Sequence, residues 1–156
     1  MIVLWWAGSE MEWEEFSDGL ALELPDLAAG TYVVISEPGS AGEGRYIQFV
    51  QEQDKLTVEV VANCFLASDK RASVEGEQAI RAAGWSRRQG SEAGNWFSML
   101  SWPAYSEDYQ RLAEMVVVAL CDGYGIEDVG TWRYKAWDES RGGRDVELTR
   151  LGLAAC

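Results

Sequence analysis

The 156-residue sequence contains no histidine and only three cysteines. Without histidine, the Ser-His-Asp and Cys-His arrangements of nucleophilic catalysis cannot form, and the commonest protein ligand of zinc, iron and copper is missing. The cysteines, Cys64, Cys121 and Cys156, are odd in number and have no Cys-x-x-Cys spacing, which argues against a disulfide framework or a zinc ribbon. The sequence therefore predicts no metal, no cofactor and no catalytic residue.

Basic residues are also scarce. Lysine and arginine number 13 against 26 acidic residues, giving a formal net charge of −13. Because this charge repels phosphate backbones and anionic headgroups, we expect neither nucleic acid nor a membrane surface as a partner. The longest apolar runs, Met1–Ala7 and Met115–Cys121, are far shorter than the roughly 20 residues of a membrane-spanning helix. Met1–Ala7 also lacks the features of a secretory signal, so we expect a cytoplasmic protein.

Length and hydrophobic periodicity predict one domain over residues 1–156 with an α+β fold. Ser9 and Glu12 have the spacing of a capping box, and apolar residues three or four apart then predict a helix over 13–27, which Pro25 should end or kink. Alternation with period two predicts strands at 31–37, 45–51 and 56–63 as an antiparallel meander. A helix capped by Ser73, a strand over 95–102, a helix from Glu107 to about Tyr124 with Ser106 as its cap, and a hairpin with its strands near 132–136 and 146–151 complete a small antiparallel sheet packed against helices.

The helix stretch Met115–Cys121 is apolar around its whole circumference and must be covered on more than one side. This pattern predicts a homodimer whose interface contains Met115, Val117, Val118 and Cys121. The alternative is that the helix at 13–27 and the C-terminal hairpin cover the same stretch within one subunit.

Segments along most of the chain together resemble the actinobacterial TY-Chap domains of the YbjN and type III secretion chaperone-like superfamily. The similar segments are Trp13–Phe16 with the helix after it, Thr31–Ile35, Tyr46–Val50, Leu56–Leu66, Glu75–Ile80, Gly84–Trp85, Asn95–Trp96, Pro103, Tyr124–Ile126 and Leu151–Leu153. The resemblance implies a small sheet with helices against it, no enzymatic activity, and a chaperone-like or adaptor function in which a segment of a partner polypeptide is bound. It also implies that dimers occur among the secretion chaperones of the superfamily.

Two other classes of function stay open from the residues alone. The first is an enzyme that uses carboxylates or Cys64, although carboxylate pairs are too numerous for any one pair to stand out. Cys64 lies beside Phe65 and Leu66 without a neighbouring basic residue, so we expect it to pack in the core. The second is a purely structural subunit.

A sheet with helices on one face leaves its other face or an edge strand for an extended peptide. We expect the peptide-binding side chains to be Tyr46, Gln48, Val50, Val61 and Trp96, and the alternative is that these residues pack under the segment 1–6. Residues 1–54 hold 11 acidic residues and one basic residue, which favours a partner segment that is basic as well as apolar.

Overall fold

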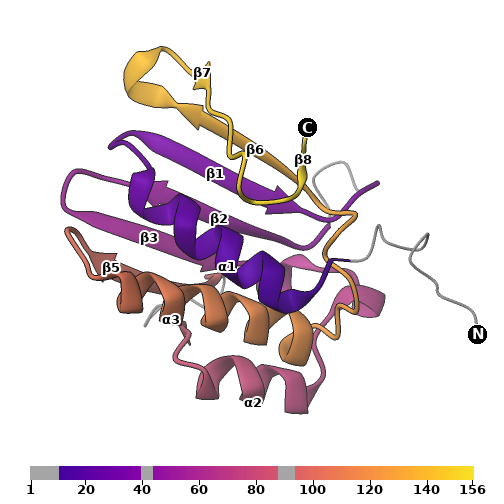
Figure 1. Ribbon diagram of the computed structural model, residues 1–156. Helices are drawn as coiled ribbons and strands as arrows, with labels where there is room; N and C mark the ends of the chain where they lie inside the picture. Colours follow the sequence, from indigo (N-terminus) through magenta and orange to yellow (C-terminus); the bar gives the residue numbers. More distant parts are fainter. Residues whose placement is uncertain (1–10, 40–43, 88–93) are drawn as a thin grey trace, which may run out of the picture.

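The computed structural model describes residues 11–39, 44–87 and 94–156 (Figure 1). The α-helices are α1 (Trp13–Glu23), α2 (Val74–Ala82) and α3 (Ser106–Val117), and α3 continues as a π-helix, η5 (Val118–Gly123). Short 3-10 helices are η2 (Leu24–Asp26), η3 (Asn63–Phe65), η4 (Ser68–Lys70) and η6 (Glu139–Arg141). The strands are β1 (Thr31–Ser36), β2 (Tyr46–Gln51), β3 (Lys55–Val60), β4 (Ser86–Arg87), β5 (Trp96–Ser101), β6 (Arg133–Asp138), β7 (Arg144–Asp145) and β8 (Ala154–Ala155).

These strands form one sheet in the order β4-β5-β3-β2-β1-β6-β7, and β8 pairs with β6. The pairs are antiparallel except β6 with β8, which is parallel. The predicted α+β architecture and the meander of β1, β2 and β3 are confirmed. The sheet is wider than predicted because β4, β7 and β8 have two residues each, too few to leave an alternating pattern in the sequence.

Local sequence explains where the helices begin and end. The α-helical part of the first helix stops at Glu23, just before Pro25, as predicted. The hydroxyl of Ser73 accepts a hydrogen bond from the Gly76 N–H at 3.0 Å and so caps α2 as predicted. Ser106 is the first residue of α3 rather than its cap, because the backbone N–H of Tyr105 donates to the Asp108 carboxylate at 3.0 Å. The predicted cap of the first helix, Ser9, lies outside the described residues.

Helices α1 and α3 lie side by side over one face of the sheet, and α2 packs on the outside against η5 (Figure 1). The core lies between α1, α3 and the covered sheet face. From α1 and α3 it contains Phe16, Leu20, Leu112 and Val116; from the strands it contains Val33, Ile35, Ile47, Phe49, Leu56, Val58, Val60 and Trp96.

This arrangement covers much of the all-apolar stretch of α3 and η5 within one subunit. Val116, Ala119 and Leu120 are buried, since α1 packs against α3 and α2 packs against η5. The four residues of the predicted dimer interface, Met115, Val117, Val118 and Cys121, remain only partly buried. One side of the stretch is therefore covered within the subunit, by α1 and α2. We had expected the C-terminal hairpin in the position that α2 occupies.

The C-terminal part differs from the predicted hairpin. The antiparallel return beside β6 is limited to Arg144–Asp145 and the Val146 N–H, which donates to the Ala136 carbonyl at 2.9 Å. It then leaves the sheet, because Leu148 is buried and its N–H donates to the Tyr134 hydroxyl at 3.0 Å. The next turn is tied to α1, where the Arg150 N–H and guanidinium both donate to the buried Glu23 carboxylate, at 2.7 and 2.8 Å.

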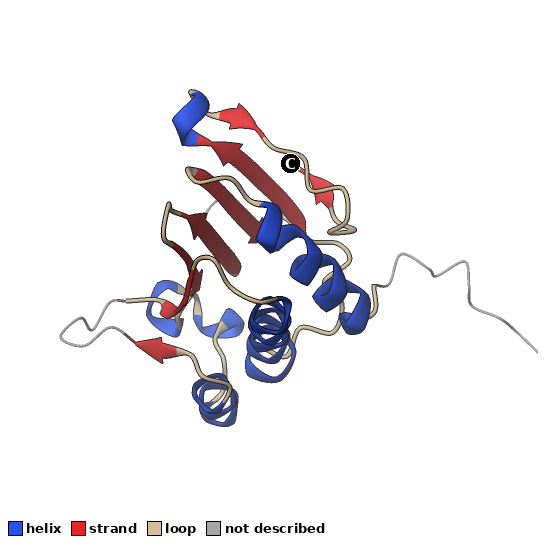
Figure 2. Cartoon of the chain, turned by 60° about the vertical axis from the view of Figure 1, so that its left-hand side comes forward, coloured by secondary structure: helices blue, strands red, loops and turns tan. Residues whose placement is uncertain are grey.

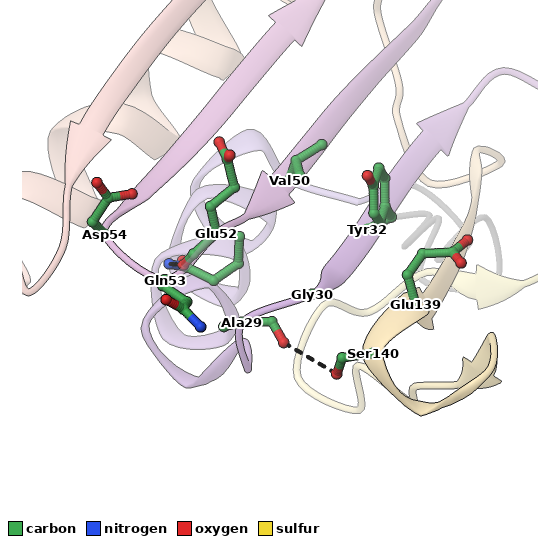
Figure 3. Close-up of a pocket in the computed structure, with 10 residues that line it drawn as sticks. Ala29, Gly30, Tyr32, Val50, Glu52, Gln53, Asp54, Glu139 and Ser140 are labelled. Atoms are coloured by element: carbon green, nitrogen blue, oxygen red, sulfur yellow. Dashed lines mark hydrogen bonds between the residues drawn. The ribbon is translucent and has the colours of Figure 1, made fainter.

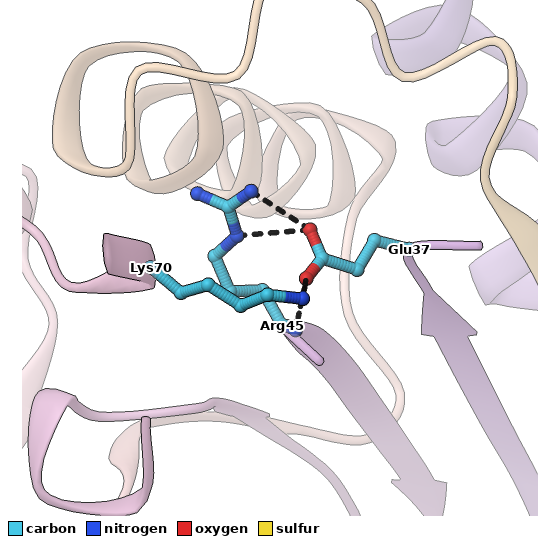
Figure 4. A network of polar contacts seen from close by, with 3 residues as sticks. All are labelled: Glu37, Arg45 and Lys70. Atoms are coloured by element: carbon cyan, nitrogen blue, oxygen red, sulfur yellow. Dashed lines mark hydrogen bonds and ion pairs between the residues drawn. The ribbon is translucent and has the colours of Figure 1, made fainter. Parts of the chain in front are cut away.

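A polar network joins the β1–β2 hairpin to η4 (Figure 4). The buried Glu37 carboxylate lies 2.8 Å from Nη2 of Arg45 and 2.6 Å from Nζ of Lys70. Burial alone would raise the pKa of Glu37, but the hydrogen bonds from Lys70 and Arg45 outweigh burial and hold this pKa below its ordinary value of 4.5. The network is a structural tie that depends on ionised Glu37.

Within the described ranges, no helix has the length and apolar character needed to cross a bilayer.

Candidate functional site

One face of the sheet carries none of the three α-helices (Figure 2). Side chains of alternate strand residues project there in two cross-strand rows. The first row is Trp137, Tyr32, Val50, Thr57 and Met99, and the second is Lys135, Val34, Gln48, Glu59 and Phe97. These ten residues define the open face. None of them is fully buried, whereas their neighbours in β1, β2 and β3 are buried under the helices.

Aromatic and aliphatic groups give the open face its apolar character. The Tyr32 and Trp137 rings stack with centroids 5.4 Å apart and planes 9° apart. The Lys135 ammonium lies 5.6 Å from the centroid of the Trp137 ring. Met99, at the other end of the first row, is 53% exposed. Half-exposed apolar side chains on adjacent strands make a surface on which further apolar side chains can be buried.

The edge of β5 adjoins the open face. Among the described residues, β4 pairs only with Trp96 and Phe97, so no strand lies along the outer edge of 98–101. Trp102 and Tyr105, just after this strand, are 47% and 77% exposed. A free strand edge offers backbone donors and acceptors to an extended chain.

A pocket of about 610 Å³ opens where the first row reaches the ends of β1 and β2 (Figure 3). Its lining includes Tyr32, Val50, Gln51, Glu52, Asp54 and Glu139. Glu52 and Asp54 come from the turn between β2 and β3, and Glu139 comes from η6. In the view of Figure 3, Glu52 and Asp54 lie on one side of Val50 and Tyr32, and Glu139 lies on the other. We call this site the acidic pocket.

The five predicted binding residues divide between two environments. Gln48 and Val50 lie on the open face, and Tyr46 lies beside it on the same side of β2. The Tyr46 hydroxyl accepts a hydrogen bond from Asn95 Nδ2 at 3.1 Å. Asn95 Nδ2 also lies 3.3 Å from Glu59 Oε1, so Tyr46 of β2, Asn95 and Glu59 of β3 form a polar cluster that borders the open face.

Val61 and Trp96 are buried, and the expectation that they are exposed was wrong. Trp96 pairs with Val60 and belongs to the helix-covered side of the sheet, with the guanidinium carbons of Arg81 and Arg87 at 5.2 and 5.3 Å from its ring. Val61 follows the last residue of β3, and its carbonyl accepts a hydrogen bond from the buried Tyr124 hydroxyl. Whether the remaining predicted residues bind a peptide stays a prediction.

Sequence reasoning missed the open-face residues outside β2. Tyr32 and Val34 had a usable signal, because alternation within β1 assigns them to the side opposite Val33 and Ile35. Trp137 had the same signal, because alternation within β6 assigns it to the side of Lys135, opposite Tyr134 and Ala136. Phe97 and Met99 had none, since neither side of β5 is distinctly polar and the pairing with β3 decides which side is covered.

Cys64 is exposed in η3, which contradicts the expectation that it packs in the core. The chain leaves the sheet after Val60, and Phe65 in the same turn is also exposed. Arg87 Nη2 lies 3.9 Å from the Cys64 sulfur. Within residues 11–39, 44–87 and 94–156, no group of three or more Cys, Asp or Glu side chains is arranged to hold a metal ion.

Comparison with protein families identifies the kind of fold. Residues 7–138 match the family model TY-Chap3, described as "T3SS (YopN, CesT) and YbjN peptide-binding chaperone 3". The chain belongs to this TY-Chap family. No curated protein and no solved structure matches the chain. The resemblance inferred from the succession of sequence segments is thus confirmed, and the matched region contains α1 to α3 and the strands β1 to β6 that carry the open face.

Proposed function

We propose that this TY-Chap chain is a non-enzymatic chaperone-like or adaptor module that binds an extended segment of another polypeptide on its open face. The observation that carries the proposal is the pair of cross-strand rows, in which apolar side chains from β1, β2, β5 and β6 lie beside a strand edge, 98–101, that is unpaired within the described residues. Membership of a peptide-binding chaperone family supports the same class of function.

Two physical contributions support binding at this place. Apolar side chains of the partner would remove Tyr32, Val34, Val50 and Met99 from water, at about 25 cal/mol per Å² of buried apolar area. An extended segment beside 98–101 would add main-chain hydrogen bonds that do not depend on the partner's sequence. Together these contributions suit a module that accepts related segments rather than one fixed sequence.

The charge of the chain favours a partner segment that is basic as well as apolar. The net charge is −13, and residues 1–54 contain one basic residue. We expect the association rate to fall as salt is added, because screening weakens electrostatic steering. The homodimer, its interface and the cytoplasmic location stay predictions, as does the absence of enzymatic activity.

The test begins with selection of 12-residue peptides from a random display library on the purified chain. Isothermal titration of the best peptide should show binding at least tenfold weaker to Val50→Asn and to Met99→Asn. Val74→Asn is the matched control, since Val74 is 67% exposed in α2, away from the open face. Hydrogen exchange should show slower exchange of the amides of 98–101 when the peptide is bound.

Circular dichroism establishes that each variant is folded. Failure to select any peptide, or equal affinity of the folded open-face variants and the control, would contradict the proposal.

A further inference from the structure

We propose that the acidic pocket binds the side chain of a lysine or arginine residue in the bound polypeptide. This inference rests on the proposed function and adds the place, the acidic pocket, at which a basic residue of the partner binds.

The charge of the acidic pocket suits a cationic side chain. Three carboxylates, Glu52, Asp54 and Glu139, line the pocket, and no basic residue is among the described residues that line it. The neighbouring pocket around Glu23 and Asp138 is different, because Arg141 and Arg150 lie within it and pair with its carboxylates. Of the acidic pocket's carboxylates, Glu52 has only a long contact of 3.8 Å to Lys55, and both of those side chains are substantially exposed. Negative charge therefore faces the space of the pocket without a cation inside it.

The wall of the pocket also suits the apolar stem of a lysine or arginine side chain. Tyr32 and Val50 belong to the pocket wall and also to the first row of the open face, so pocket and face form one continuous surface. Glu139 accepts a hydrogen bond from the Trp137 indole at 2.7 Å, which links it to the stacked Tyr32–Trp137 pair. A lysine or arginine stem can pack on such apolar groups while its charged end reaches the carboxylates.

The experiment uses single-residue probes, so that it does not depend on a selected peptide. Nuclear magnetic resonance follows the Trp137 indole N–H during titration with N-acetyl-arginine methylamide or N-acetyl-lysine methylamide. N-acetyl-norleucine methylamide serves as an uncharged probe of similar length. We expect a saturable shift of the Trp137 signal with at least one basic probe, no saturable shift with the norleucine probe, and weaker binding in 0.5 M salt.

The double variant Glu52→Gln/Asp54→Asn should raise the Kd of the basic probe at least fivefold. The control double variant, Asp69→Asn/Glu75→Gln, removes the same charge from exposed positions in η4 and α2. Equal weakening in both double variants would show that only the diffuse charge of the chain attracts the probe, and it would overturn the proposal. Equal shifts with the norleucine probe would overturn it as well.

The outcome also separates this inference from the proposed function. Open-face binding of selected peptides that lack a basic residue, with no effect of Glu52→Gln/Asp54→Asn, would remove the cation site and leave the peptide-binding function. Binding of the basic probes without selection of any peptide would leave the cation site and remove the function.

Discussion

Gly76 in α2 lies against the backbone carbonyl of Gly123 in η5, with no room for a Cβ atom between them. A Cβ on Gly123 would in turn meet the side chain of Ile80. This close approach is what lets α2 pack onto the π-helix and cover the apolar stretch that follows α3. Both glycines are therefore required by packing rather than by backbone conformation.

Gly76→Ala should consequently destabilise the protein. Alanine favours a helix over glycine by about 1 kcal/mol, but overpacking costs about 1–3 kcal/mol, and here the obstacle is backbone that cannot rotate away. Chemical denaturation should show a net loss of stability. The exposed Gln78→Ala in the same helix is the control, and a stabilised Gly76→Ala variant would contradict the packing argument.

Glu37 should make stability depend on pH in the acid range. Its pKa is lowered in the folded state, so its contribution is present above the ordinary value of 4.5 and is lost as the pH falls through the folded value. Glu37→Gln should cost about 1–3 kcal/mol at pH 7, because two charged hydrogen-bond donors lose their partner. Urea unfolding between pH 7 and pH 3 should show the variant and the wild type converging at low pH. A difference that is independent of pH would contradict this account.

Tyr124→Phe should remove the hydrogen bond to the Val61 carbonyl without changing the packing of the ring. Because Tyr124 is buried and burial raises its pKa, the hydroxyl stays protonated as a donor across the working pH range. We expect a loss of about 1–2 kcal/mol in the free energy of unfolding. Tyr105→Phe at an exposed position should be neutral, and equal effects of the two changes would refute the proposed role of the bond.

Replacement of Trp96 and of Met99, both in β5, should affect different properties: the stability of the fold for Trp96 and peptide binding for Met99. Trp96→Ala removes a buried ring and should cost about 3–5 kcal/mol, which prevents its use as a simple probe of binding. Met99→Ala, three residues on, changes a half-exposed side chain of the open face and should alter stability little while weakening peptide binding. Thermal unfolding and titration of a selected peptide distinguish the two effects. A destabilised Met99→Ala with unchanged binding would assign Met99 to the core.

The predicted dimer is tested by light scattering at high micromolar concentration. Val117 and Val118 line a groove of about 370 Å³ with Trp13, between α1 and α3, and remain partly exposed there. If this groove forms the interface, the wild type should have the mass of a dimer and Val117→Glu that of a monomer. Val74→Glu should leave the mass unchanged. A monomeric wild type would refute the dimer.

The sequence predicted elements well where one element determines its own pattern. The helix break before Pro25 and the cap at Ser73 follow from local chemistry, and alternation assigned Gln48 and Val50 to the open side of β2. It failed for β5, where alternation places Trp96 and Met99 on opposite sides but does not indicate which side is covered; pairing with β3 puts Trp96 on the covered side beside Val60 and Met99 on the open face beside Thr57. The acidic pocket was not predicted because Glu52 and Glu139 are far apart in sequence and line one pocket only through the pairing of β1 with β2 and β6.

The two edges of the sheet differ in how far other strands cover them, and this difference limits where subunits could pair edge to edge. Beyond the family match, residues 139–156 place β7 and β8 along the outer edge of β6, and the Cys156 N–H donates to the Tyr134 carbonyl at 2.8 Å. That side of the sheet is closed to strand addition, while 98–101 on the opposite side has no neighbouring strand in the part of the chain that the structure describes. Subunits that paired with one another through the 98–101 edge alone would therefore stop at a pair and could not form a longer chain through successive edge contacts.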